Sequence, residues 1–165
     1  MKKVRLQWFP PYKVADLYFL LEKSVLVSDE KYSALNNYGF YIYYDEKSPT
    51  PPKYIGQSYG KSKKTLAKRI RWEIVKDGVD GGAVSKFTVK CGDRPVSLGL
   101  TLKVGHIKEP PETEHTPQLM NDIEMALIFK MQPVMNDRGK KRYRRGSIEI
   151  SNEVDSYPPT EVIRL

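Results

Sequence analysis

The chain has 165 residues and an excess of basic side chains, with 28 Lys and Arg against 20 Asp and Glu, a net charge of +8 and a pI near 9.4. This length suits one compact domain whose core is large enough to fold alone, and the charge favours a polyanionic partner. The one cysteine, Cys91, excludes an internal disulfide and any zinc cluster built from paired cysteines.

No part of the sequence predicts a membrane contact. The N-terminal residues Met-Lys-Lys-Val-Arg-Leu-Gln-Trp-Phe-Pro-Pro contain no apolar region of signal-peptide length. No segment approaches the roughly 20 apolar residues that cross a bilayer as a helix. We therefore expect a cytoplasmic protein without a membrane partner.

Residues 12–36 predict an amphipathic helix, because apolar side chains recur at intervals of three and four residues. These side chains are Val14, Leu17, Tyr18, Leu21 and Val25. Residues 39–44 are dense in aromatic and β-branched side chains and predict a strand. The prolines within residues 45–52 cannot continue a ladder, so residues 53–57 are expected to return as the antiparallel partner of that strand.

A second helix is predicted at residues 62–75, with Ser62 as its N-cap and Gly78 as its stop. Its apolar stripe comprises Leu66, Ile70 and Ile74. Further strands are predicted at residues 86–91 and at residues 96–107, where apolar side chains alternate with small or polar ones.

Residues 92–95, Gly-Asp-Arg-Pro, predict the turn between these two strands. Thr116 is the expected N-cap of another helix, because a proline follows at the first helical position, and this helix must end before Pro133. Together the elements predict an α+β fold, with a small antiparallel sheet and helices on both of its sides.

Short motifs within these elements resemble those of the GIY-YIG endonuclease superfamily. The first predicted strand reads Gly-Phe-Tyr at residues 39–41, and its partner reads Tyr-Ile-Gly at residues 54–56. The helix that follows carries Leu-Ala-Lys-Arg at residues 66–69, and Glu124 stands twelve positions before Asn136.

The resemblance implies one nuclease domain over residues 1–165, with a core at about residues 38–137 that contains a three-stranded antiparallel sheet. A helical extension is expected at residues 1–37 and a basic extension at residues 138–165. An added hairpin is expected at residues 86–105.

The same resemblance implies a Mg²⁺-dependent or Mn²⁺-dependent endonuclease that hydrolyses phosphodiester bonds in double-stranded DNA, with a restriction endonuclease as one subtype. Alternatives are a repair, recombination or mobile-element nuclease, and a DNA-binding protein whose catalysis is impaired. A homodimer would allow both DNA strands to be cut.

Tyr41 matches the first motif tyrosine, which implies a role as the general base. Its pKa, near 10 in reference peptides, would have to fall by ~3 units, or about 4 kcal/mol, to act at neutral pH. Lys53, Lys61 and Lys64 are close enough in sequence to assist. The alternative is that Tyr41 and Tyr43 are ordinary strand aromatics.

Tyr54 matches the second motif tyrosine, which implies a hydrogen bond to a phosphate oxygen or to the attacking water. Arg69 matches the helix arginine, whose planar fork can hold two phosphate oxygens. We favour Arg69 over Arg71, because Arg69 borders the apolar stripe whereas Arg71 is turned toward solvent. The alternative for Arg69 is a solvated helix face.

Glu124 places a carboxylate within an apolar helix stripe, because at 100° per residue it lies within about 60° of several apolar positions. These positions are Met120, Leu127, Ile128 and Met131. Burial of the charge requires a compensating partner, and the resemblance implies Mg²⁺ held mostly by water and phosphate. A salt bridge to Arg69 or a lysine is the alternative. Asn136 would position the loop or contact the phosphate, or else simply follow the helix.

Two residues depart from the family pattern. Glu73 stands four positions after Arg69, where relatives often carry histidine or tyrosine, and it could pair with the arginine, join the metal site or replace a base. Gln57 replaces the lysine of some relatives. Both departures leave activity open.

Basic side chains on the second helix and after Asn136 are candidate DNA contacts. They are Lys63, Lys68, Arg71, Arg138, Lys140, Lys141, Arg142, Arg144 and Arg145. A solvated loop is the alternative for residues 138–145. His106 and His115 lie outside the motifs and are expected to be structural or solvated.

Overall fold

The computed structural model describes the chain except residues 24–26, 60–64, 76–98, 140–142, 144–145 and 154–161. Several sequence predictions lie outside the described residues: the strand at 86–91, the turn at 92–95, Gly78, Lys61, Lys63, Lys64, Lys140, Lys141, Arg142, Arg144 and Arg145. Ser62 is also outside them, and its prediction as the N-cap of the second helix is wrong, because the helix Leu66–Ile74 is capped by Thr65, whose side chain accepts from the Lys68 N–H at 3.3 Å.

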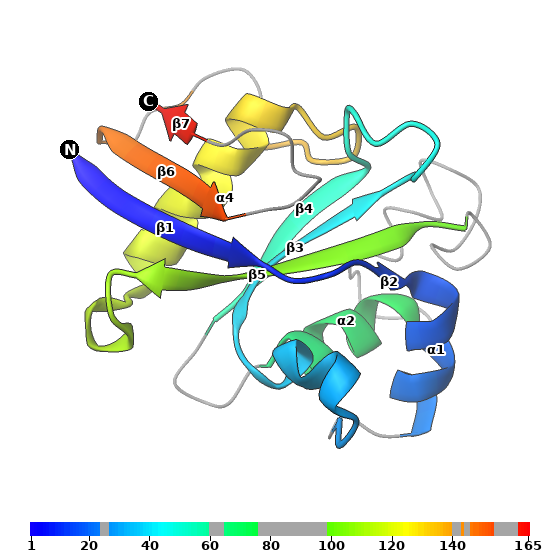
Figure 1. Cartoon of the computed structure of the whole chain (residues 1–165). Coiled ribbons are helices and arrows are strands. Elements are labelled where there is room, and N and C mark those ends of the chain that lie inside the picture. The colour runs from blue at the N-terminus through cyan, green and yellow to red at the C-terminus, as the bar shows by residue number, and fades with distance from the viewer. Residues whose placement is uncertain (24–26, 60–64, 76–98, 140–142, 144–145, 154–161) are drawn as a thin grey trace.

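The described residues form a curled, seven-stranded sheet with strand order β4-β3-β5-β1-β6-β7, and β2 pairs with β5 beside this path (Figure 1). The strands are β1 (Lys2–Trp8), β2 (Tyr12–Lys13), β3 (Gly39–Tyr44), β4 (Tyr54–Ser58), β5 (Thr101–Glu109), β6 (Ile148–Glu153) and β7 (Val162–Arg164). The helices are α1 (Val14–Lys23), α2 (Leu66–Ile74) and α4 (Pro117–Met131), with 3₁₀ helices η1 (Glu30–Asn36) and η2 (Glu112–Glu114).

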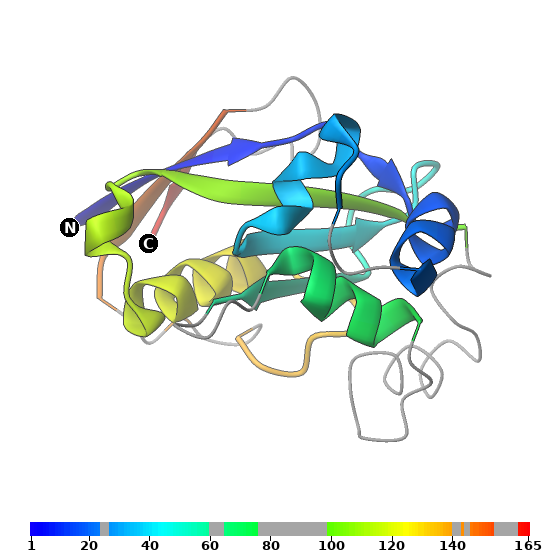
Figure 2. The same cartoon turned by 90° about the horizontal axis from the view of Figure 1, so that it is seen from below.

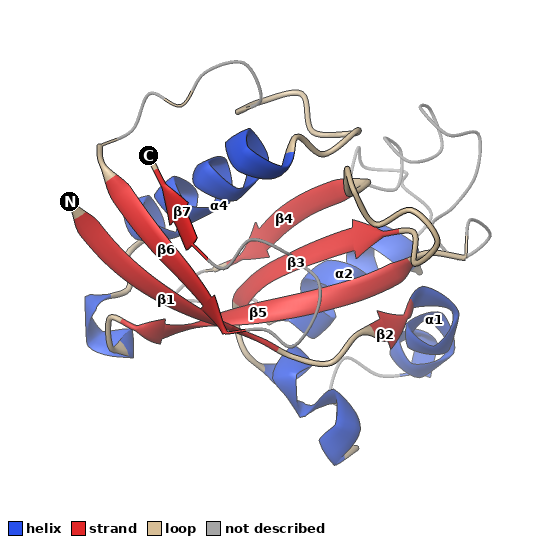
Figure 3. Ribbon diagram, turned by 45° about the horizontal axis from the view of Figure 1, so that its top comes forward, coloured by secondary structure: helices blue, strands red, loops and turns tan. Residues whose placement is uncertain are grey.

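The expected small, three-stranded antiparallel sheet is wrong, because β1, β6 and β7 extend the sheet beyond β5. β1 and β6 run parallel, as their arrows in Figure 3 show, so the sheet is mixed. The sequence pattern that accounts for β1 as a strand is an alternation with a period of two. Val4, Leu6 and Trp8 are buried, and the residues between them are polar or exposed. Ile148 and Ile150 repeat this pattern in β6.

The N-terminal region is only partly helical. α1 begins at Val14, whereas Tyr12 and Lys13 pair with β5 as β2. The last part of the predicted helix at residues 12–36 is the separate 3₁₀ helix η1, which begins at Glu30 after an Asp29 cap. The expected helical extension at residues 1–37 therefore also contributes two strands to the sheet.

The central hairpin and the last helix agree with the sequence. β3 pairs antiparallel with β4, with Tyr41 opposite Gly56, and β3 also pairs antiparallel with β5. Thr116 caps α4, since its side chain accepts a hydrogen bond from the Leu119 N–H at 3.1 Å, and proline follows as expected.

Side chains of β3 alternate between two apolar cores. Tyr41 and Tyr43 pack in the core that contains residues of α1, η1 and α2, whereas Phe40 and Ile42 pack in the core that contains α4. β4 forms one edge of the sheet, and both α2 and α4 contact it. These two helices therefore flank the β4 edge from opposite faces. Figure 2 shows α4 in yellow and α2 in green.

None of the helices within the described ranges combines the length and the apolar content that crossing a bilayer requires.

Candidate active site at the β4 edge

The two motif strands are matched through Tyr41 and Gly56. The Tyr41 ring lies across Gly56, so that a Cβ added there would stand 2.9 Å from Tyr41 Cε2 and closer still to Cζ and the hydroxyl. The glycine of the second motif is thus required by the tyrosine of the first, because no larger side chain leaves room for the ring.

A buried carboxylate lies at the end of the Tyr41 ring. The Tyr41 hydroxyl donates to Glu73 Oε1 at 2.5 Å, and the Tyr43 hydroxyl donates to Glu73 Oε2 at 3.1 Å. Arg69, one turn earlier on α2, places its Nε 3.0 Å from Glu73 Oε1 and 3.2 Å from the Tyr41 hydroxyl. The pairing with Arg69, one of the three roles left open for Glu73, is therefore present.

The expected role of Tyr41 as a general base is disfavoured by this arrangement. Its side chain is fully buried, and among the described residues its hydroxyl is paired with Glu73 and Arg69, not with Lys53. Burial, with the charge of Glu73 as the next cause, raises the pKa of Tyr41 well above its usual value of 10. A base needs the opposite shift.

Arg69 and Tyr54 are partly accessible polar groups on this side of the edge. The Arg69 side chain is 38% exposed although its Nε is held by Glu73. Tyr54 is partly buried and hydrogen-bonded to Arg69, and burial raises its pKa to about 12 against the opposing effect of the arginine. Lys68 on the same helix is exposed.

Arg71, expected as a DNA contact, has a structural partner within the chain. Its Nε donates to the Leu21 carbonyl at 2.7 Å, and its side chain is partly buried. Arg71 therefore joins α2 to α1 and satisfies a carbonyl near the C-terminal end of α1.

Glu124 reaches the opposite face of the same edge. Its Oε2 accepts from the Gln57 amide at 3.2 Å, and that amide also donates to Asn121 at 2.7 Å. Burial is the main cause that raises the pKa of Glu124 to about 6. Glu124 makes no ion pair with a described residue, so the alternative of a salt bridge to Arg69 is not seen.

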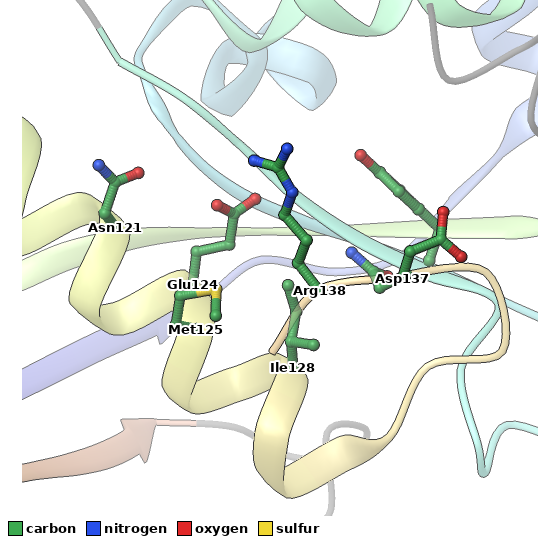
Figure 4. Close-up of a pocket in the computed structure, with 8 residues that line it drawn as sticks. Asn121, Glu124, Met125, Ile128, Asp137 and Arg138 are labelled. Atoms are coloured by element: carbon green, nitrogen blue, oxygen red, sulfur yellow. The ribbon is translucent and has the colours of Figure 1, made fainter. Parts of the chain in front are cut away.

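A cavity of about 590 Å³ opens beside Glu124, and Figure 4 shows the Glu124 carboxylate and the Arg138 guanidinium projecting on the same side of it. Its lining residues are Tyr54, Asn121, Glu124, Met125, Ile128, Asn136, Asp137 and Arg138. A neighbouring cavity of about 260 Å³ is lined from both helices, by Gln57, Ser58, Tyr59, Arg69, Pro117 and Asn121. Arg69 from α2 and Glu124 from α4 thus approach the β4 edge from its two faces.

Asn136 is a structural residue at this edge. Its Oδ1 accepts from the Ile55 N–H at 2.9 Å, and its Nδ2 donates to the Ile55 carbonyl at 2.8 Å. The side chain thereby imitates a neighbouring strand for β4. This pairing disfavours the expected phosphate contact of Asn136, because its amide oxygen and its amide nitrogen both already bond the Ile55 backbone.

Both histidines have structural partners, as expected. His106 Nε2 lies 2.9 Å from the Ala34 carbonyl, and burial lowers its pKa. His115 Nε2 lies 2.8 Å from the Pro110 carbonyl, while its Nδ1 lies 2.7 Å from the Tyr38 hydroxyl.

Two polar residues of the larger cavity were not singled out from the sequence. Asn121 precedes Glu124 by three positions, and this spacing on one helix face is the signal that could have identified it. Asp137 follows Asn136 in the loop after α4, and no periodicity marks it. Its place at the cavity depends on how the loop returns to β4.

Among the described residues, no three His, Cys, Asp or Glu side chains are grouped to hold a metal ion. The carboxylates of Glu124 and Asp137 line the larger cavity together with nearby amides, and such oxygen ligands fit Mg²⁺ when water and phosphate complete its coordination. Comparisons of the chain with family models, with curated proteins and with solved structures give no match.

Proposed function

We propose that this protein is a Mg²⁺-dependent endonuclease that hydrolyses phosphodiester bonds in DNA. The observation that carries the proposal is the convergence of Arg69 and Glu124 on the β4 edge, with cavities of about 590 and 260 Å³ beside them. The guanidinium of Arg69 is complementary to a phosphate. The carboxylate of Glu124, which makes no ion pair with a described residue, is complementary to a divalent cation. The motif resemblance and the charge of +8 support the same class.

Glu124 is the residue that would hold the metal. Burial of its carboxylate, relieved by one hydrogen bond from Gln57, leaves a negative charge for which a cation is the natural partner. When bound, Mg²⁺ would neutralise phosphate charge and lower the pKa of a coordinated water. The manganese ion would serve the same oxygen ligands.

The chain's own residues bind and orient the phosphate in this proposal. Glu73 and Tyr41 occupy the Nε of Arg69 and Tyr54 is also hydrogen-bonded to Arg69, so the remaining Nη donors are the ones that the fork can offer to phosphate oxygens. Tyr54, between Arg69 and the larger cavity, would donate its hydroxyl to a phosphate oxygen or orient the water. Exposed Lys68 and Arg138 would contact flanking phosphates.

A DNA-binding protein without turnover is the second candidate. The observation that favours it is the pairing of Tyr41 with Glu73, which keeps the hydroxyl buried and raises its pKa. Such a protein would retain Arg69 and the basic surface but could not use Tyr41 to take a proton from water. Restriction, repair and mobile-element roles are all compatible with the nuclease, as is a homodimer.

Nicking of supercoiled plasmid distinguishes the two candidates. The nuclease should convert plasmid to the nicked form with Mg²⁺ and not with EDTA, and Glu124→Gln should lose this activity while still shifting the plasmid on a gel. Glu114→Gln, an exposed glutamate in η2, is the matched control and should cut normally. A wild-type protein that shifts DNA without cutting it in any divalent cation would favour the binder.

A further inference from the structure

The proposed function leaves the buried carboxylate of Glu73 without a role. Its side chain has 0% exposure, and burial raises its pKa against the opposing effect of Arg69. Three donors surround it, from β3 and from α2. A buried carboxylate is costly unless such donors are fixed in place. The fold therefore holds these three donors around the Glu73 carboxylate.

The two oxygens of Glu73 have different partners. Oε2 accepts from Tyr43 at 3.1 Å. Oε1 is shared by the Tyr41 hydroxyl at 2.5 Å and by Arg69 Nε at 3.0 Å, and these two donors are themselves 3.2 Å apart. Tyr41, Glu73 and Arg69 therefore form a closed triangle of contacts, in which the rigid member is a fully buried ring on a central strand.

This triangle restricts the rotation of the Arg69 side chain. An arginine held only by its terminal groups keeps much of its rotamer freedom, whereas a contact at Nε fixes the plane of the fork. The Arg69 side chain lines the cavity of about 260 Å³ together with Gln57 and Asn121. Glu73 and Tyr41 contact the Nε of Arg69, and Tyr54 is also hydrogen-bonded to Arg69. The Nη donors that these contacts leave could bind a phosphate without a further ordering cost.

We propose that Glu73 is a positioning residue that fixes the guanidinium of Arg69 for the phosphate, and that the Tyr41 hydroxyl holds both side chains in place. This inference rests on the proposed function. It assigns Tyr41 to orientation of the arginine, through Glu73 and through its direct contact with Nε, rather than to removal of a proton from water.

Glu73→Gln and Tyr41→Phe test the proposal, with Tyr44→Phe as the control that removes a hydroxyl from the same strand. Misplacing the fork should lower kcat for plasmid nicking by ~100-fold while the gel-shift affinity changes little. Tyr44→Phe should retain the wild-type kcat. In an Arg69→Ala background, Glu73→Gln should cause no further loss of kcat, because a positioning residue acts only through the residue that it positions.

An NMR measurement separates this inference from the proposed function. The Nε–H signal of Arg69 should shift and exchange faster with water in Glu73→Gln and in Tyr41→Phe, but not in Tyr44→Phe. If wild-type protein does not cut DNA while these signals behave as expected, the nuclease proposal fails and the geometry of the triangle stands. If the protein cuts DNA and folded Glu73→Gln or Tyr41→Phe keeps its kcat, the positioning role is overturned. An unchanged Arg69 signal in both variants would overturn it equally.

Discussion

Gly56→Ala should destabilise the protein strongly, although it adds a single methyl group. The new Cβ would lie 2.9 Å from Tyr41 Cε2 and closer to Cζ and the hydroxyl, and the ring cannot withdraw, since Tyr41 is fully buried. Overpacking and the displaced hydrogen bond to Glu73 should together cost about 2–6 kcal/mol. Urea unfolding followed by circular dichroism measures this change in the free energy of unfolding.

Two variants make the reasoning refutable. Gly146→Ala is the control, because no atom lies within 4 Å of a Cβ added there, and its free energy of unfolding should match that of the wild type. In a Tyr41→Leu background the ring is gone, so the added cost of Gly56→Ala should largely disappear. If Gly56→Ala were tolerated in the wild type, or were equally costly without the ring, the packing of the two motifs would be misassigned.

Three further changes have outcomes that follow from the same region. Burial raises the pKa of Glu124 from 4.5 to about 6, so its contribution to stability is present below pH 4.5 and is lost as the pH rises through about 6. Glu124→Gln should therefore remove about 2 kcal/mol of pH dependence in metal-free urea titrations, and an unchanged pH profile would contradict the burial of its charge. Asn136→Ala should cost about 1–3 kcal/mol by leaving the Ile55 backbone unpaired, and normal thermal stability would restore a purely functional role. Arg71→Ala should lower the melting temperature, because it releases the Leu21 carbonyl, while the salt dependence of DNA binding stays unchanged; a flatter dependence would return Arg71 to the DNA surface.

Local patterns predicted the elements that depend on neighbours in sequence. The β3–β4 hairpin follows from aromatic and β-branched runs separated by prolines, and α4 follows from its threonine cap and proline. The pairing of Glu73 with Arg69 was among the alternatives, because residues four apart share a helix face.

Features that depend on distant pairing were missed or misassigned. The strand at Lys2–Trp8 has a clear alternation, but its place between β5 and β6 depends on segments about 100 and 145 residues away. Nothing in the sequence near Asn136 indicates that its amide completes the edge at Ile55. The environment of Tyr41 was also hidden, since its pKa depends on a carboxylate that reaches it from α2.

The most direct test of the account is a double-mutant cycle on Mg²⁺-dependent plasmid nicking with Arg69→Lys and Glu124→Gln. The central claim is that these residues reach one phosphodiester bond from the two faces of the β4 edge. The account predicts that the wild type nicks plasmid, that each variant is severely impaired, and that the double variant is much less impaired than the product of the two single effects. Independent, multiplicative effects on kcat, or a wild type without divalent-dependent nicking, would contradict it.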